Sequence, residues 1–216
     1  MSTSAGRLRA LRGGVRLEVF TVAWMVVEAV IAIGAGIGAR SVLLTAFGLD
    51  SAIELLSGAI LLWRLSAEVR SSDLERVEKA ERRATWVAAV LLVLLCLYLA
   101  TTSIAGLLTR LEPLESWAGI GISGAAVIVM PLLAWRKRHA NRTIQSPALR
   151  ADIAETITCA YMAGTTLVGV AITALAGWWW CEYVAGFALL IFIGREAWEA
   201  LEAAREGGVE DHEHDP

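Results

Sequence analysis

The chain has 216 residues, of which 56% are hydrophobic, and its formal net charge is −3 at pH 7. This composition is too apolar for an ordinary soluble domain and indicates an integral membrane protein. The three cysteines are scattered, which excludes a disulfide framework and a CxxC metal knuckle, and we expect no nucleic-acid partner.

Six apolar segments follow one another along the chain, at 17–38, 41–63, 84–108, 116–135, 148–176 and 178–197. Each approaches or exceeds the roughly 20 residues that a helix needs to cross a bilayer. The sequence therefore predicts an all-α integral membrane protein, a bundle of six transmembrane helices. The first segment is of full spanning length and lacks a small-residue cleavage site, so we expect no cleavable signal peptide.

The connections between these segments have their own signals. A tight turn is expected at Ala39–Arg40 and another at Gly177, where three tryptophans follow in the manner of an interfacial aromatic belt. The charged segment 66–83 contains two opposite-charge pairs at i,i+4 spacing and predicts a short helical extension.

Three regions are expected along the chain: a basic N-terminal arm (1–16), a six-helix transmembrane transport domain (17–201) and a short disordered acidic tail (202–216). The tail is too short and polar to fold. Its His212 and His214 could contact a metal ion, but a solvated tail is the interpretation we prefer.

Basic residues predict the orientation in the membrane. Of the 19 Lys and Arg residues, 17 fall at the N-terminus, in the second and fourth connections or at the C-terminal end, and only Arg40 and Arg110 fall on the other side. The positive-inside rule then places both termini in the cytoplasm of a multi-pass protein of the cell membrane.

Several carboxylates lie inside the apolar segments, namely Glu28, Asp50, Glu54 and Glu155, with Asp152 one turn nearer the cytoplasm. Ionisable residues at membrane depth are rare and usually mark a path for ions or protons. Each could instead stay protonated and hydrogen-bond a neighbouring helix, but this explains one such residue better than four.

The spacing of these acids predicts a metal site. Asp50 and Glu54 are four residues apart and share one helix face, as do Glu155 and Cys159. Since their two helices run antiparallel, the pairs should face each other and supply four ligands. Oxygen and thiolate donors suit a divalent transition metal such as zinc. A buried cysteine also serves as a small hydrophobic residue, which is the alternative for Cys159.

An enzymatic function is not expected. The stretch FGLD at 47–50 is similar to the GxGD motif of intramembrane aspartyl proteases, but Phe47 replaces the first glycine and a second catalytic aspartate motif is missing. The GxGxxG match at 119–124 lies inside an apolar segment with no strand before it, so small residues for helix packing explain it better.

Three local stretches resemble the cation diffusion facilitators. ARSVLLTAFGLDSAIELLSG (39–58) is similar to the turn and second helix of that family, and SPALRADIAETITCAYMAG (146–164) to the entry into its fifth helix. GWWWCEYVAGFALLI (177–191) resembles its sixth helix, with Glu182-Tyr183 where Asp-Pro is common. The resemblance covers about residues 17–200.

The resemblance implies export of a divalent cation from the cytoplasm in exchange for protons, with Asp50, Glu54, Glu155 and Cys159 as metal ligands and no further cofactor. The chain differs from the family in having no histidine at these positions, which leaves the choice of metal ion undecided. Zinc is the first candidate, and cadmium, cobalt, iron and manganese are the alternatives. Glu28 and Asp152 are further candidates as ligands or proton relays.

The family's cytoplasmic domain, which supports dimerisation, has no counterpart in these residues, so a homodimer would form through the membrane helices. Two other functions remain alternatives. One is a proton or monovalent-cation channel or transporter using the same acids, and the other is a membrane accessory protein that transports nothing.

Overall fold

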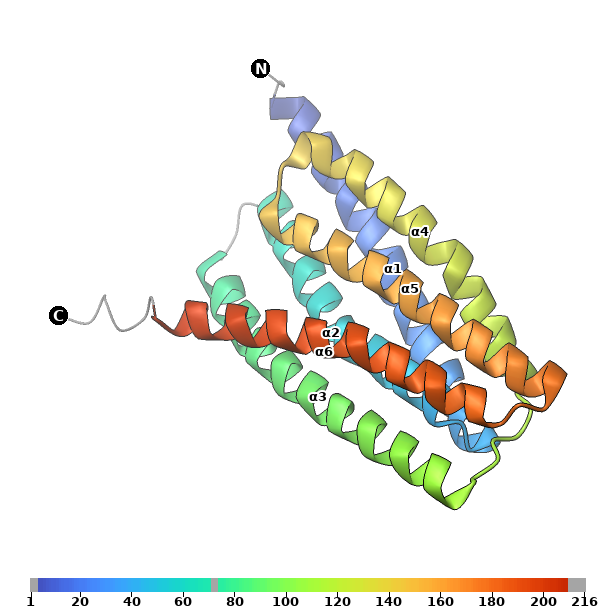
Figure 1. Cartoon of the computed structure of the whole chain (residues 1–216). Helices are drawn as coiled ribbons and strands as arrows, with labels where there is room; N and C mark the ends of the chain where they lie inside the picture. The colour runs from blue at the N-terminus through green and yellow to red at the C-terminus, as the bar shows by residue number, and fades with distance from the viewer. Residues whose placement is uncertain (1–3, 71–73, 210–216) are drawn as a thin grey trace.

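The computed structural model describes residues 4–70 and 74–209, and these residues form six α-helices and no strand. The helices are α1 (Ser4–Ala39), α2 (Val42–Arg70), α3 (Leu74–Thr109), α4 (Trp117–Ile144), α5 (Pro147–Ala176) and α6 (Trp180–Val209) (Figure 1). The prediction of an all-α bundle of six helices is confirmed.

Several helices are longer than the apolar segments that predicted them. α1 begins at Ser4, inside the segment 1–16 predicted as an arm, and α6 continues to Val209, past the position 202 where the tail was predicted to begin. Both extensions lack proline, and residues that favour helix make up most of each: Ala, Leu and Arg in the first, Ala, Glu and Arg in the second. Hydropathy locates the part of a helix in the bilayer, not its ends. His212 and His214 lie outside the described residues.

The second connection is confirmed as helical on both sides. α2 runs to Arg70 and α3 begins at Leu74, so most of the charged segment 66–83 belongs to these two helices. The predicted turns are also confirmed. Arg40 has a left-handed φ of 54° between α1 and α2, and Gly177 has φ 66° and caps the end of α5.

Five of the six described helices have the length and composition of membrane spans. Within the described residues, α1 to α5 each contain a span long and apolar enough to cross a bilayer. α6 is 30 residues long, but its uncharged stretch is bounded by Glu182 and Arg195. Large apolar side chains cover the outer surface, including Ile37, Leu108 and Ile128. These side chains are exposed to lipid in a multi-pass membrane protein.

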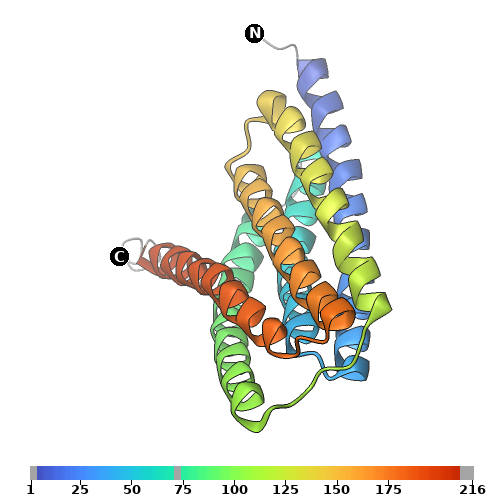
Figure 2. The ribbon, with the colours of Figure 1, turned by 45° about the vertical axis from the view of Figure 1, so that its right-hand side comes forward.

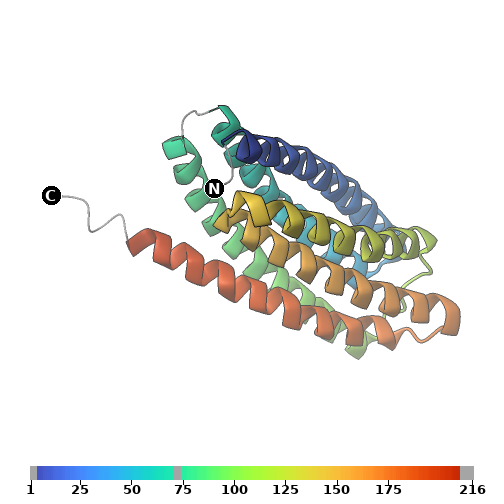
Figure 3. The same ribbon diagram turned by 90° about the horizontal axis from the view of Figure 1, so that it is seen from above.

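The helices pack as neighbouring antiparallel pairs around α2. α1 packs on α2, α4 on α5, and α3 on α6, and α2 also contacts α3, α5 and α6. Seen from above, α5 lies between α4 and α6 (Figure 3). The C-terminal half of α6 diverges from α5 (Figure 2). The start of α1 and the end of α6 lie at the same end of the bundle (Figure 1).

The backbones of α1 and α2 touch at two glycines. A Cβ atom added at Gly36 would lie 2.6 Å from the backbone nitrogen of Thr45, and one added at Gly48 would lie 2.8 Å from that of Ile33. Only glycine permits so close an approach. This contact holds α2 against α1 and leaves its opposite face, with Asp50 and Glu54, for the interior of the bundle.

Candidate metal centre

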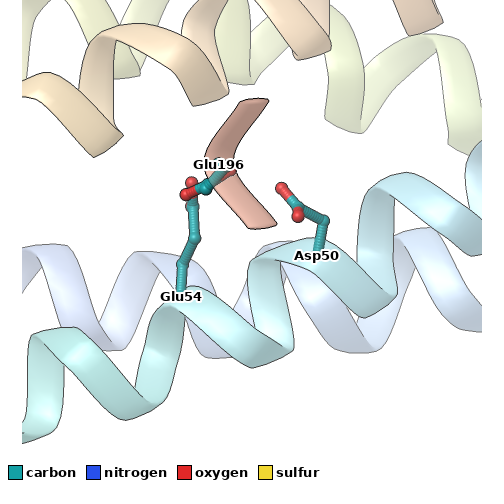
Figure 4. A group of neighbouring side chains, drawn as sticks. All are labelled: Asp50, Glu54 and Glu196. Carbon is teal, nitrogen blue, oxygen red and sulfur yellow. The ribbon is translucent and has the colours of Figure 1, made fainter. Parts of the chain in front are cut away.

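Asp50 and Glu54 project from one face of α2 into the interior, as their four-residue spacing predicts. Their side chains meet Glu196 of α6 (Figure 4), and one carboxylate oxygen from each of the three residues lies within 4.8 Å of the others. We call Asp50, Glu54 and Glu196 the Asp50 cluster. Its oxygens are close enough together to bind one metal ion.

The carboxylates of this cluster are poorly compensated by the protein. Asp50 is completely buried, and neither of its oxygens has a hydrogen-bond partner within residues 4–70 and 74–209. Glu54 Oε1 and Glu196 Oε2 also lack one there. Buried polar groups nearly always have a hydrogen-bond partner, because leaving one without a partner costs free energy. Such oxygens can bind a cation or hold protons.

Glu155 and Cys159, the two ligands predicted on α5, do not join the same compact group. Glu155 lines a cavity together with Glu54 and Glu196. Cys159 is completely buried, and its thiol donates a hydrogen bond to Glu28 Oε1 at 3.7 Å. Glu54 also lies close to this thiol. Of the four predicted ligands, the structure therefore brings Asp50 and Glu54 together and adds Glu196.

Glu28 is buried and satisfied by hydrogen bonds. Besides the thiol of Cys159, Glu28 accepts hydrogen bonds from Trp24 Nε1 at 2.7 Å and from Ser51 Oγ at 2.8 Å. Three donors from α1, α2 and α5 thus converge on this carboxylate. Glu28 links the helices behind the Asp50 cluster.

Asp152 belongs to a second group of buried charges. Lys137 Nζ of α4 lies 2.6 Å from Asp152 Oδ2 and 3.1 Å from Glu18 Oε2 of α1. Thr156 Oγ1 is 3.4 Å from the same nitrogen. We call Glu18, Lys137 and Asp152 the Lys137 triad. The sequence predicts that Lys137 lies in the fourth, cytoplasmic connection. In the structure α4 continues to Ile144, and the side chain of Lys137 is completely buried.

A cavity of about 550 Å³ leads to the Asp50 cluster. It lies between α2, α3, α5 and α6, and its lining includes Glu54, Asp152, Glu155 and Glu196. The lining continues to Ala203 of α6, toward the end of the bundle at which the termini lie. The sequence predicts that this end of the bundle faces the cytoplasm.

Glu18, Lys137 and Glu196 were missed in the sequence, although helical periodicity contained a signal for the first two. In α1, Glu18, Thr21, Met25 and Glu28 are all buried and recur at helical spacing, so they form one stripe along the helix. Lys137 continues the buried stripe of α4, whereas the place of the half-buried Glu196 depends on how α6 packs. Each of these three residues lies near a predicted end of an apolar segment, so the sequence alone suggests that it belongs to a solvated connection.

The family of the chain follows from comparison with known proteins. The sequence matches the family described as the cation efflux transmembrane domain over residues 19–206, which takes in parts of all six helices. The chain belongs to this cation efflux family. Its members are membrane cation transporters, so the resemblance seen in the local stretches is confirmed.

One curated relative is an uncharacterized transporter of Synechocystis sp. It is 27% identical over 169 residues, which cover 71% of this chain and 54% of the relative. The chain therefore spans about half the length of that relative.

Proposed function

We propose that this chain transports a divalent transition-metal cation across the membrane and binds it at Asp50 and Glu54. The observation that carries the proposal is the Asp50 carboxylate, completely buried and without a hydrogen-bond partner for either oxygen in the described residues. A carboxylate is costly at such depth unless a cation or proton compensates it. The cation efflux family supplies the reason to choose a cation as cargo.

The proposed ligands come from three helices. Asp50 and Glu54 of α2 are joined by Glu196 of α6, and Glu155 of α5 is available from the wall of the same cavity. The thiol of Cys159 is engaged as a donor to Glu28, so we assign it a supporting place beside the cation. The ligand oxygens then belong to carboxylates alone.

These donors bear on the choice of cation. Carboxylate oxygens suit manganese well and also bind zinc, whereas thiolates select softer ions. We therefore propose manganese and zinc as cargoes and expect cadmium to be carried less well. Cobalt and iron are divalent ions of intermediate preference and belong in the same test panel.

Proton exchange follows from competition for the same oxygens. A carboxylate must be deprotonated to bind a metal ion, so binding releases protons, and protonation releases the ion. We propose that the ion enters from the cytoplasm through the cavity beside Glu155. It leaves on the other side of the membrane in exchange for protons. Cation binding should weaken as the pH falls, because protons then occupy the ligand oxygens.

Reconstituted liposomes test this proposal directly. Purified protein is placed in vesicles with a pH gradient, and the fluxes of metal and protons are followed with manganese, zinc, cobalt, iron and cadmium in turn. We expect metal-dependent proton flux that is absent with Asp50→Asn. Proton or potassium flux that needs no divalent ion would favour the channel alternative, and no flux at all from folded protein would favour an accessory protein.

A further inference from the structure

A second cavity, of about 390 Å³, lies between α4 and α5 and shares Ala154 and Ile157 with the wall of the first. Its lining consists of Arg138, Asn141, Arg142, Arg150, Ile153, Ala154 and Ile157. All three arginines are exposed, and within the part of the chain that the structure describes their guanidinium groups form no ion pair or hydrogen bond. Three cations from two helices thus converge on one hollow without an acidic partner.

The geometry points to a binding site for the head group of an anionic phospholipid. An arginine guanidinium offers a planar set of N–H donors that matches a phosphate, often through two parallel hydrogen bonds. Three such groups together can surround one phosphodiester. Basic pockets between transmembrane helices near the cytoplasmic surface are suited to anionic head groups.

The apolar part of the lining selects a lipid over a free anion. Ile153 is already buried in the core, but the exposed Ala154 and the half-buried Ile157 continue from Arg150 along α5 in the direction of the membrane interior. Ile157 is seven residues beyond Arg150, which is about 10 Å along a helix. A free phosphate would leave this apolar surface uncovered, whereas the first methylene groups of an acyl chain would cover it.

The turn between α4 and α5 holds the polar end of the cavity in place. Asn141 donates from Nδ2 to the carbonyl oxygen of Ser146 at 3.2 Å and accepts from the Ser146 backbone N–H at 2.9 Å. Ser146 in turn caps α5 through the Leu149 N–H. The two helix ends that present Arg142 and Arg150 are therefore fixed relative to each other before a lipid binds.

The position along the bundle agrees with an anionic lipid. The α4–α5 turn lies at the end of the bundle where the chain termini lie (Figure 1), which the positive-inside rule assigns to the cytoplasm. The cytoplasmic leaflet attracts basic segments through its negative surface potential.

Native mass spectrometry of the full chain in detergent tests the site. The protein is titrated with phosphatidylglycerol and with phosphatidylcholine of the same acyl chains. Wild-type protein should retain phosphatidylglycerol preferentially. Each arginine near an anionic surface adds roughly fivefold to the affinity, so Arg138→Gln/Arg142→Gln/Arg150→Gln should lose on the order of 100-fold. Arg142→Gln alone should lose roughly fivefold, which keeps the test usable if the triple variant is poorly folded.

Arg136→Gln is the matched control, because Arg136 is an exposed arginine of α4 that does not line the cavity. It should bind phosphatidylglycerol as the wild type does. Equal retention of both lipids by the wild type, or an equal loss with Arg136→Gln and Arg142→Gln, would overturn the site. In a second arm, phosphatidylglycerol should raise the melting temperature and inorganic phosphate should not. Equal stabilisation by phosphate would show a plain anion site and overturn the assignment to lipid.

Discussion

The two groups of buried charge in this bundle differ in how the protein compensates them. In the Lys137 triad, one ammonium group lies between two carboxylates at 2.6 and 3.1 Å and joins α1, α4 and α5. In the Asp50 cluster, three carboxylates meet with their oxygens within 4.8 Å, and four of these oxygens have no hydrogen-bond partner in the described residues. In the first group the protein itself supplies a cation, although neither oxygen of Glu18 has a hydrogen-bond partner in the described residues. In the second group no side chain of the described residues supplies a cation.

We infer that the first group of charges holds the fold and that the second is kept for a ligand. Removing one partner of a buried ion pair leaves a charge uncompensated and destabilises the protein strongly. Removing an uncompensated carboxylate relieves a cost and should be neutral or stabilising. Substitutions in the two groups should therefore change stability in opposite directions, and only one group should affect cation binding directly.

The largest change in stability should come from Lys137→Met, which leaves Glu18 and Asp152 buried without their cation. We expect a loss of about 3–5 kcal/mol in the free energy of unfolding, seen as a lower melting temperature in detergent. The control adds Glu18→Gln and Asp152→Asn to the same chain and should recover most of that loss, because the charges are then removed together. A single variant as stable as the wild type would contradict a structural triad.

The largest change in transport without a loss of stability should come from Asp50→Asn. The amide keeps the size of the side chain but lacks the charge that a cation needs, so metal flux should fall to the level of empty vesicles. The melting temperature should stay equal to that of the wild type or rise. Glu54→Gln and Glu155→Gln should behave in the same way. Folded variants that still move metal at the wild-type rate would show that the cation binds elsewhere.

A smaller effect is expected at Glu196, the carboxylate that α6 contributes. Glu196→Gln should weaken metal binding by about 10-fold or more, since even groups that only support a metal ligand contribute that much. The measurement is calorimetric titration with manganese. Glu199→Gln is the matched control on the same helix, because Glu199 lines the cavity mouth and pairs with Arg195 at 3.7 Å. Equal losses in both variants would point to general electrostatic attraction.

The smallest effect should come from Cys159→Ser. A hydroxyl can donate to Glu28 as the thiol does, so the hydrogen-bonded group behind the cluster should survive. Manganese flux should stay close to that of the wild type, and any residual cadmium flux should fall. A loss of manganese flux as complete as with Asp50→Asn would make the sulfur a ligand.

The sequence predicted the bundle and the α2 half of the site because each rests on local periodicity. Six apolar segments specify six helices, and a four-residue interval places Asp50 and Glu54 on one face whatever surrounds them. Glu196 could not be found in this way, because its place beside Asp50 depends on how α6 packs against α2. The ligands predicted on α5 could not be checked from the sequence for the same reason. The rotation of α5 about its axis decides whether Cys159 faces a metal ion or Glu28.

The paired charges were missed for a related reason. Glu18 and Lys137 stand near the edges of apolar segments, and hydropathy averages over such edges. The charge of Glu18 is compensated by Lys137 only in the folded protein, because the two residues lie on different helices. In the sequence, each residue therefore resembles part of a charged connection. An apolar stripe followed through these positions would have shown that both side chains face inward.

The contact between α1 and α2 has a consequence for movement. With no room for a methyl group between Gly36 and Thr45 or between Gly48 and Ile33, the two helices cannot slide along each other without separating. The hydrogen bond from Ser51 to Glu28 joins the same two helices and is preserved as long as they stay together. A movement of α2 that keeps this contact would therefore carry α1 and Glu28 along with Asp50 and Glu54. Glu196 belongs to a separate helix, so a movement of α6 relative to α2 would change the proposed ligand set without separating Asp50 from Glu54.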